Sequence, residues 1–208
     1  MAKLDLKKVF KHLYAPSTKD VSIVDVPPLP FLMVDGSGNP NTAQSYADAV
    51  SALYSTAYTL KFMLKTRDAA LDFAVMPLEG LWWADDMDAF GQGDKDQWQW
   101  TALIAQPDFV TAADVQAALG AARRKKTVAA LDLVRFETLH EGPSAQILHV
   151  GSYADETANI ARLHDWIAAN GYMRSGKHHE IYLSDPSRTA PEKLRTVVRQ
   201  PYREADSR

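Results

Sequence analysis

The chain of 208 residues contains no cysteine. This absence excludes a disulfide framework, a thiolate metal site and a cysteine nucleophile. Long apolar runs are missing too, and none approaches the roughly 20 residues that a membrane-spanning helix needs. A large excess of one charge is also lacking, because 23 basic residues nearly balance 26 acidic ones and leave a net charge of −3. With 46% apolar residues, the composition is that of a globular protein that buries its core without covalent crosslinks.

Signals for export and for nucleic-acid binding are also weak. Residues 1–14 (MAKLDLKKVFKHLY) are mixed and charged, without the apolar centre of a secretory signal peptide. We therefore expect a cytoplasmic protein without membrane contact. The tightest basic run, 123–126, falls where a helix is expected to end, and cations interact favourably with the helix dipole there. Because a dense basic stripe is missing, we expect no nucleic-acid partner.

The common cofactor and metal motifs are absent from the sequence. Neither GxGxxG nor GxxxxGK[ST] occurs, which argues against dinucleotide and P-loop sites. The GxSxG elbow of serine hydrolases is missing as well. Six histidines are present, but they lack the spacing of zinc or iron ligands. We expect neither a cofactor nor a metal ion.

Hydrophobic periodicity predicts three helices and seven strands. The helices are expected at 42–66, 111–126 and 155–170, with Thr42 and Thr111 as N-caps, Asp114 completing a capping box and Gly171 ending the third helix. The strands are expected at 29–35, 70–76, 98–106, 131–140, 145–151, 178–183 and 194–199. The remaining segments are expected to be a short helix or arm at 1–20, an acidic loop at 84–97 and a turn at 141–143.

The order of these elements repeats along the chain. Residues 29–106 run strand, glycine turn, helix, strand, strand, and residues 145–200 follow the same order. Two such β-α-β-β units can pair through their edges into one antiparallel sheet, with helices on one side and a shared central ligand cleft. We expect an α+β fold with this pseudo-twofold arrangement, a domain at 21–202, an N-terminal arm at 1–20 and a C-terminal tail at 203–208.

The strand expected at 178–183 carries the most informative side chains. Alternation places His178, Glu180 and Tyr182 on one face, and the residues between them on a face that packs under helices. If the first face lines the cleft, Glu180 could hold a cationic ligand or act as a general base on water. The alternative is a solvated strand face on which Glu180 forms a structural ion pair.

Aromatic residues gather in the same part of the predicted fold. Four of the five tryptophans fall within 19 residues: Trp82, Trp83, Trp98 and Trp100. Such a group can form the walls of a pocket for flat or cationic molecules, or it can be core packing. Tyr54 and Tyr58 are neighbours on one helix face, where a phenol could donate over the cleft or simply pack. Glu79 is either a second pocket carboxylate or a loop residue.

Four segments resemble the GyrI-like small-molecule-binding family. They are PLEGLWW at 77–83, WTALIAQP at 100–107, QILHVG at 146–151 and HHEIYLSDP at 178–186, of which the last is the most specific. The resemblance covers residues 20–202 and implies a pseudo-twofold pair of β-α-β-β units around a central cleft. The family includes ligand-sensing domains of multidrug-responsive regulators, in which a pocket carboxylate and aromatic walls hold lipophilic cations. Glu180 stands at the position that is similar to that carboxylate.

The resemblance further implies a stand-alone form, similar to a subgroup that carries the tryptophan pair. Those members are implied to hydrolyse the cyclopropane of DNA-alkylating natural products and so detoxify them. In that interpretation Glu180 is the general base, Tyr58 or Tyr182 is the donor, and His178, Glu79, Tyr54 and the four tryptophans bind the small molecule. The alternative is a non-enzymatic module that inhibits a partner enzyme through its surface.

Overall fold

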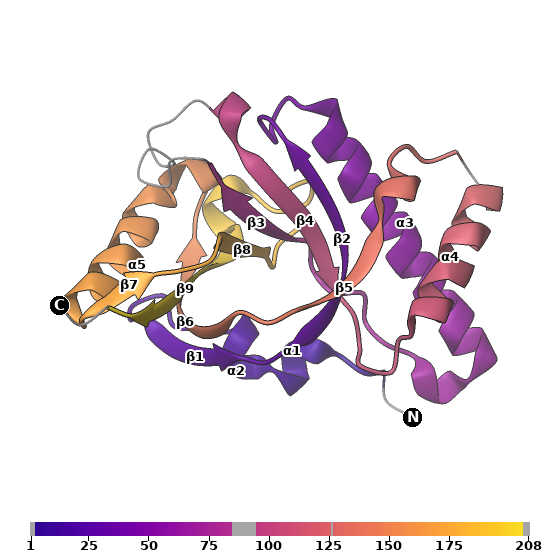
Figure 1. Cartoon of the computed structure of the whole chain (residues 1–208), viewed down its shortest axis with the longest axis horizontal. Helices are drawn as coiled ribbons and strands as arrows, with labels where there is room; N and C mark the ends of the chain where they lie inside the picture. The colour runs from indigo at the N-terminus through magenta and orange to yellow at the C-terminus, as the bar shows by residue number, and fades with distance from the viewer. Residues whose placement is uncertain (1–2, 85–94, 126, 206–208) are drawn as a thin grey trace.

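The computed structural model describes residues 3–84, 95–125 and 127–205, and its described strands form one curled antiparallel sheet (Figure 1). The order of strands across it is β1-β6-β9-β8-β3-β4-β2-β5, and the short β7 pairs with β9. The strands are β1 (Ser22–Val26), β2 (Leu29–Ser37), β3 (Glu79–Trp83), β4 (Gln99–Ala105), β5 (Arg135–Leu139), β6 (Gly142–Val150), β7 (Tyr172–Arg174), β8 (His178–Tyr182) and β9 (Arg195–Glu204). The helices are α1 (Leu6–Val9), α2 (Lys11–Tyr14), α3 (Gln44–Arg67), α4 (Ala112–Lys125) and α5 (Thr157–Ala169).

The strand order is symmetric about the central pair β3 and β8. On one side of this pair the order is β3-β4-β2, with α3 connecting β2 to β3, and on the other side it is β8-β9-β6, with α5 following β6. The two halves join through an antiparallel register in which Gly80 lies opposite Glu180 and Trp82 lies opposite His178. The α+β class and the edge-paired antiparallel sheet expected from the sequence are therefore confirmed.

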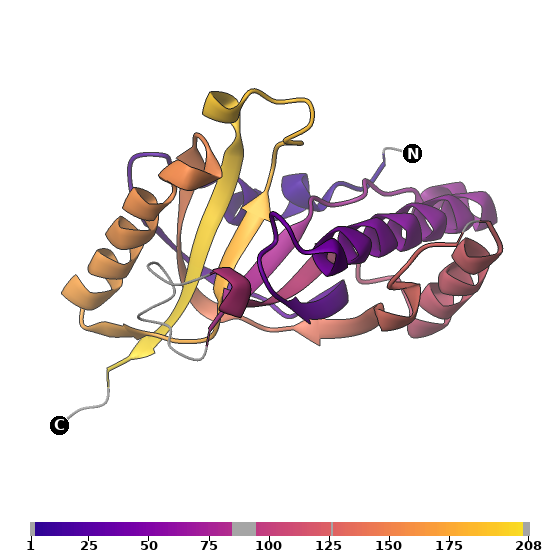
Figure 2. The same ribbon diagram turned by 90° about the horizontal axis from the view of Figure 1, so that it is seen from above.

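The helices lie on both faces of this sheet (Figure 2). The long helices α3 and α5 flank one face, and α4 packs against α3. The short helix α2 lies against the opposite face, where the Tyr14 hydroxyl donates to Glu79 of β3. One apolar cluster fills the space between the sheet and α3 with α4, and a smaller one around Leu163 and Ile167 anchors α5 on β6 and β9. The sequence predicted helices on one side of the sheet, and this holds for the long helices but not for the short N-terminal α2.

The strand expected at 70–76 is wrong. Residues Ala69–Leu71 form a 3-10 turn, and only a single bridge between Leu4 and Phe73 is made there. Phe73 and Met76 are both buried, so the segment has the apolar pattern of a strand although it does not pair with a neighbouring strand. The strand begins beyond Pro77, at Glu79, where β4 and β8 supply backbone partners on both sides.

Other local expectations have mixed outcomes. The Thr111 hydroxyl accepts from the Asp114 backbone N–H at 3.1 Å and the Asp114 carboxylate accepts from the Thr111 N–H at 3.1 Å, which confirms the capping box. Gly171 follows α5 with φ of +79°, as its role at the helix end requires. Thr42 is not an N-cap, because the cap position falls on Ala43. The acidic loop expected at 84–97 lies mostly outside the described residues.

Besides β3, two short strands were not predicted. Strand β1 ends immediately before Pro27. Pro27 and Pro28 separate β1 from β2, but they do not prevent residues 22–26 from forming a strand. Strand β7 has only three residues, too few to show alternation. Among the described residues, no helix combines the length and the apolar character that crossing a bilayer demands.

Candidate functional site

A cavity of about 1290 Å³ opens between α3 and α5 over the centre of the sheet. Its floor is formed by β3 and β8, where the two halves of the sheet meet. All three side chains expected on the cleft face of β8, His178, Glu180 and Tyr182, line this cavity. Alternation along an extended strand is sufficient to explain this placement, because residues two apart point to one face.

Glu180 is held from two sides by its neighbours on the same strand. The Tyr182 hydroxyl donates to Glu180 Oε2 at 2.8 Å, and His178 Nε2 lies 3.2 Å from Glu180 Oε1. Burial alone would raise the pKa of Glu180, but the contacts with His178 and Tyr182 outweigh it and leave the pKa below its usual value. The carboxylate is therefore ionised and fixed at the cavity wall.

Trp82 extends this arrangement onto β3. Its indole folds back over Gly80, so closely that a Cβ at Gly80 would lie 2.6 Å from Trp82 Nε1. The indole N–H donates to the Tyr182 hydroxyl at 3.1 Å. A glycine two residues before the tryptophan is thus required for the chain of hydrogen bonds from Trp82 through Tyr182 to Glu180.

The four tryptophans separate into two pairs. Trp82 and Trp98 line the cavity and meet edge to face, with ring centroids 5.8 Å apart. Trp100 lies behind the wall, fully buried and 5.0 Å from the ring of Tyr46. Trp83 points away from the cavity, where the Lys177 ammonium lies 3.2 Å from its ring centroid. Alternation along β3 separates Trp82 from Trp83.

Tyrosines of α3 form the opposite wall. Tyr54 and Tyr58 both line the cavity and stack at 6.2 Å, and Tyr58 is 49% exposed at the rim. Tyr46 also lines the cavity, 5.7 Å from Trp82. Burial and the nearby Glu180 charge raise the pKa of Tyr46, so its phenol stays neutral.

Glu156 also belongs to this cavity, although it did not stand out in the sequence. It lies at the start of α5, is 3% exposed and lines the same cavity as Glu180. Burial and the Glu180 charge raise the pKa of Glu156 to about 8. A glutamate at a helix start is usually a partner of the helix dipole, so only its tertiary surroundings mark it.

Glu79 lies on the other face of the sheet and does not line the cavity. There His179, expected to pack under helices, is enclosed by acidic groups. Its Nε2 is 3.0 Å from Glu79 Oε2 and its Nδ1 is 2.9 Å from Glu141 Oε1. Arg199 Nη1 donates to Glu141 Oε2 at 3.0 Å. This second cluster is buried and structural, under the N-terminal helices.

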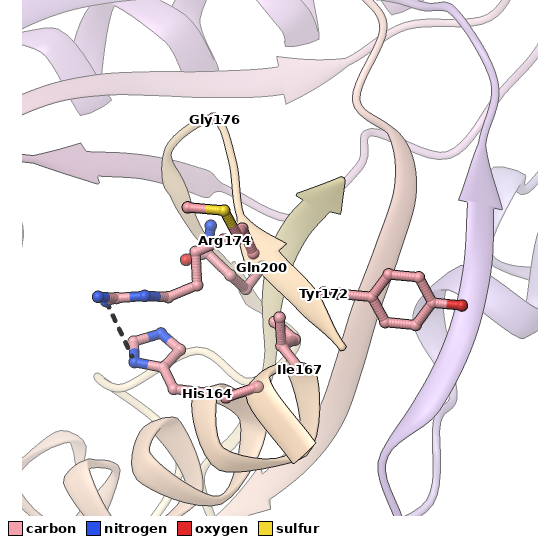
Figure 3. Close-up of a pocket in the computed structure, with 8 residues that line it drawn as sticks. His164, Ile167, Tyr172, Arg174, Gly176 and Gln200 are labelled. Atoms are coloured by element: carbon pink, nitrogen blue, oxygen red, sulfur yellow. Dashed lines mark hydrogen bonds between the residues drawn. The ribbon is translucent and has the colours of Figure 1, made fainter. Parts of the chain in front are cut away.

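A smaller pocket of about 360 Å³ adjoins the large cavity beside α5 and β7 (Figure 3). His164, Arg174 and Gln200 line both spaces. His164 Nδ1 and Arg174 Nη1 are 3.5 Å apart, as the dashed line in Figure 3 marks. Burial and the Arg174 charge lower the pKa of His164 to about 4, so its imidazole is neutral. Among the described residues, no three histidine or carboxylate groups are arranged to hold a metal ion.

The family model for the GyrI-like small molecule binding domain matches residues 19–203. The chain belongs to the GyrI-like family. Its cavity, at the junction of two sheet halves, is therefore the cavity of a small-molecule-binding domain.

The chain is also similar to several solved structures. An uncharacterized conserved protein from Listeria innocua is 39% identical, with a TM-score of 0.88 over 97% of this chain and 100% of that one. A hydrolase from Listeria innocua is 37% identical, with a TM-score of 0.84 over the same shares. The EcmrR C-terminal domain, at 11% identity and a TM-score of 0.56 over 89% of this chain and 98% of that one, shares the fold alone. No curated protein matches the chain.

The GyrI-like cavity combines three chemical elements. Aromatic rings of Trp82, Trp98 and Tyr54 offer flat apolar walls. The ionised Glu180 can attract a cation or accept a proton from water. The buried Glu156 supplies a second carboxyl group of different acidity. These residues could therefore support either the binding of a small molecule or acid-base chemistry on it.

Proposed function

We propose that this chain is a hydrolase that detoxifies flat, electrophilic small molecules by adding water to a strained cyclopropane ring, the reactive group of certain DNA-alkylating natural products. The observation that carries the proposal is Glu180, an ionised carboxylate fixed by His178 and Tyr182 at the wall of an aromatic cavity. The likeness to a Listeria innocua hydrolase at 37% identity favours an enzyme.

The proposed reaction does not require a strong base. A cyclopropane conjugated to a carbonyl is already strained, and its ring opens when water attacks one ring carbon. The electron pair of the broken C–C bond then moves to the carbonyl oxygen. Glu180 orients the water and takes its proton as the new C–O bond forms, which a carboxylate with a low pKa can do when attack is well advanced.

The walls of the cavity favour flat substrates. Trp82 and Trp98 lie at the inner side, and Tyr54 and Tyr58 stack along α3 at the rim. A planar conjugated molecule can lie between these two aromatic surfaces and bury its faces. A cationic group would be attracted to Glu180 and to the ring faces.

The first experiment follows ring opening by mass. The protein is incubated with a cyclopropane-containing DNA alkylator, and wild type is compared with Glu180→Gln. This substitution keeps the shape but removes the negative charge and the basicity. We expect wild type to add the mass of one water, and the Glu180→Gln rate to fall by at least about 100-fold. Glu192→Gln, at an exposed glutamate away from the cavity, is the matched control.

The same samples separate the alternatives. Equal rates for wild type and Glu180→Gln would remove Glu180 from the chemistry. No mass gain, together with quenching of tryptophan fluorescence by the alkylator, would make the chain a binding protein. Neither response to the alkylator nor to a panel of planar dyes would favour a module that acts on a partner protein through its surface.

A further inference from the structure

The structure leaves one carboxyl oxygen of Glu156 without a partner inside the fold. It is 3% exposed, it lines the cavity, and its Oε1 is buried without a hydrogen-bond partner among the described residues. Burying a carboxyl oxygen without a partner costs free energy and contributes nothing to the stability of the fold. This unpartnered oxygen belongs to a side chain that lines the cavity, so a bound molecule can supply the missing partner.

Two of the donors beside Glu180 are already used. The single hydroxyl proton of Tyr182 goes to Glu180 Oε2 at 2.8 Å, and the indole proton of Trp82 goes to the Tyr182 oxygen at 3.1 Å. Tyr58 lies at the exposed rim. Negative charge develops on the carbonyl oxygen during ring opening, and a proton donated there stabilises the transition state. Glu156 lines the same cavity and, unlike the exposed Asp165 and Asp185, is buried, so it is the carboxyl group best placed to supply a proton.

The surroundings of Glu156 keep that proton in place at neutral pH. Burial is the main cause, and the charge of Glu180 on β8 adds to it. The Thr196 hydroxyl on β9 and the Lys95 ammonium act in the opposite direction. Tyr153, just before α5, stays neutral because burial and the Glu156 charge raise its pKa to about 12. The net result is a pKa of about 8 for Glu156, beside a pKa below the usual value for Glu180. Two carboxyl groups of one site with separated acidities are the usual arrangement of an acid and a base.

We propose that Glu156 is a second catalytic carboxyl group, which is protonated before the substrate binds and gives its proton to the substrate's carbonyl oxygen while Glu180 takes a proton from water. The inference rests on the proposed hydrolysis and narrows its substrate class. The substrate carries a neutral carbonyl conjugated to the strained ring, so that a neutral acid can bind it before charge develops.

The step balances without any further reactant. The water oxygen bonds to a cyclopropane carbon, and its proton moves to Glu180. The C–C bond breaks, its electron pair reaches the carbonyl oxygen, and that oxygen takes the proton of Glu156. The product is the substrate plus one water. Proton exchange with solvent, after product release, returns Glu156 to the acid and Glu180 to the carboxylate.

The test compares wild type, Glu156→Gln, Glu180→Gln and the control Glu192→Gln in the full chain, with the alkylator named above. Glutamine at 156 keeps the size and a hydrogen-bond donor but cannot transfer a proton. We expect kcat to fall by at least about 100-fold in Glu156→Gln while KM changes only a few-fold. Wild-type kcat/KM should decline as pH rises through about 8, and this decline should be missing in Glu156→Gln.

A second readout does not need turnover. Carbon-13 NMR of glutamate-labelled protein should show one carboxyl group titrating near pH 8, absent in Glu156→Gln and shifted to lower pH in Glu180→Gln, which lacks the opposing charge. Ring opening at the wild-type rate and with the wild-type pH profile in Glu156→Gln would overturn the inference and leave the proposed hydrolase intact. Titration of Glu156 at an ordinary carboxyl pKa would overturn it as well. Absence of ring opening in wild type would instead refute the proposed function, and the inference with it.

Discussion

At the scale of single residues, strand β8 separates two acidic environments by alternation alone. Glu180 faces the cavity, while the next residue back, His179, faces a closed cluster beneath the N-terminal helices. In that cluster, burial disfavours the charged forms, but the mutual attraction is stronger. The pKa of His179 is raised to about 9 by Glu141 and Glu79, and the pKa of Glu141 is lowered to about 2 by His179 and Arg199.

These shifts predict how stability depends on pH. The Glu141 contribution is present above its usual pKa near 4.5 and is lost as pH falls towards 2. The His179 contribution is complete below its usual pKa near 6.5 and is lost as pH rises through about 9. The loss of stability at low pH and the loss at high pH both arise from the ion pair between Glu141 and His179. Urea unfolding at a series of pH values should therefore give the greatest free energy of unfolding between about 4.5 and 6.5 from this pair.

Glu141→Gln checks the assignment. Removing one partner of a buried ion pair should lower the free energy of unfolding by about 3 kcal/mol at neutral pH, because His179 and Arg199 lose a buried counter-charge. The free energy of unfolding should then depend less on pH at both the acidic and the alkaline end. A variant with an unchanged pH dependence of stability would show that this dependence arises elsewhere, and Glu137→Gln on the exposed part of β5 serves as the control.

At the scale of elements, β3 depends on a glycine that the resemblance highlighted but did not explain. Gly80 lies on the cleft face opposite Glu180, and the Trp82 indole occupies the space above it. The same relation recurs in β2, where a Cβ at Gly36 would lie 2.2 Å from the Trp100 ring. In both strands a missing side chain lets an indole lie flat on the sheet.

Gly80→Ala should therefore displace the Trp82 indole. We expect a loss of about 1–3 kcal/mol in stability from overpacking and a weaker fluorescence response to planar ligands, because the bond from Trp82 to Tyr182 is disturbed. Gly120→Ala is the matched control, since its Cβ would meet only the flexible end of Arg124 at 3.7 Å within α4. That variant should gain about 1 kcal/mol through helix propensity. Equal free energies of unfolding for the two variants in chemical denaturation would contradict the prediction.

At the scale of the whole molecule, helix α2 closes the face of the sheet opposite the cavity. Arg199 Nη2 donates to the Leu13 carbonyl at 2.9 Å, and Gln146 Nε2 donates to the His12 carbonyl at 2.6 Å. Tyr14 donates to Glu79 Oε1 at 3.2 Å. Residues 12–14 thus satisfy buried polar groups of three strands and belong to the packed structure.

Tyr14→Phe isolates one of these bonds. Loss of a buried hydrogen bond to a carboxylate should cost about 1.5–3 kcal/mol in thermal or urea unfolding. Ring opening by the folded variant should proceed at the wild-type rate, because the bond lies across the sheet from Glu180. Tyr202→Phe, where the ring lies tilted against Tyr172 with centroids 4.6 Å apart, is the control. A large change in kcat for Tyr14→Phe would mean that the two faces are coupled.

Sequence patterns located some parts of the site and missed others for definite reasons. The placement of His178, Glu180 and Tyr182 on one face follows from alternation, which is local. The separation of Trp82 from Trp83 follows in the same way. The expected strand at 70–76 was wrong because buried residues without a ladder imitate strand alternation. Glu156 gave no signal because a glutamate at a helix start has an ordinary local explanation.

The sequence by itself determined the local features: the helix periods, the capping box at Thr111, the strand faces and the aromatic and acidic character of the cleft. These depend on residues within a few positions of one another, so the pattern contains them. The tertiary structure alone decided which groups meet. Trp82 and Tyr182 are 100 residues apart, Tyr14 and Glu79 are 65 apart, and the acidity of Glu156 depends on burial and on Glu180 from another element. Burial and distant charge are properties of the folded chain, and they distinguish the catalytic carboxyl groups proposed here from the structural ones.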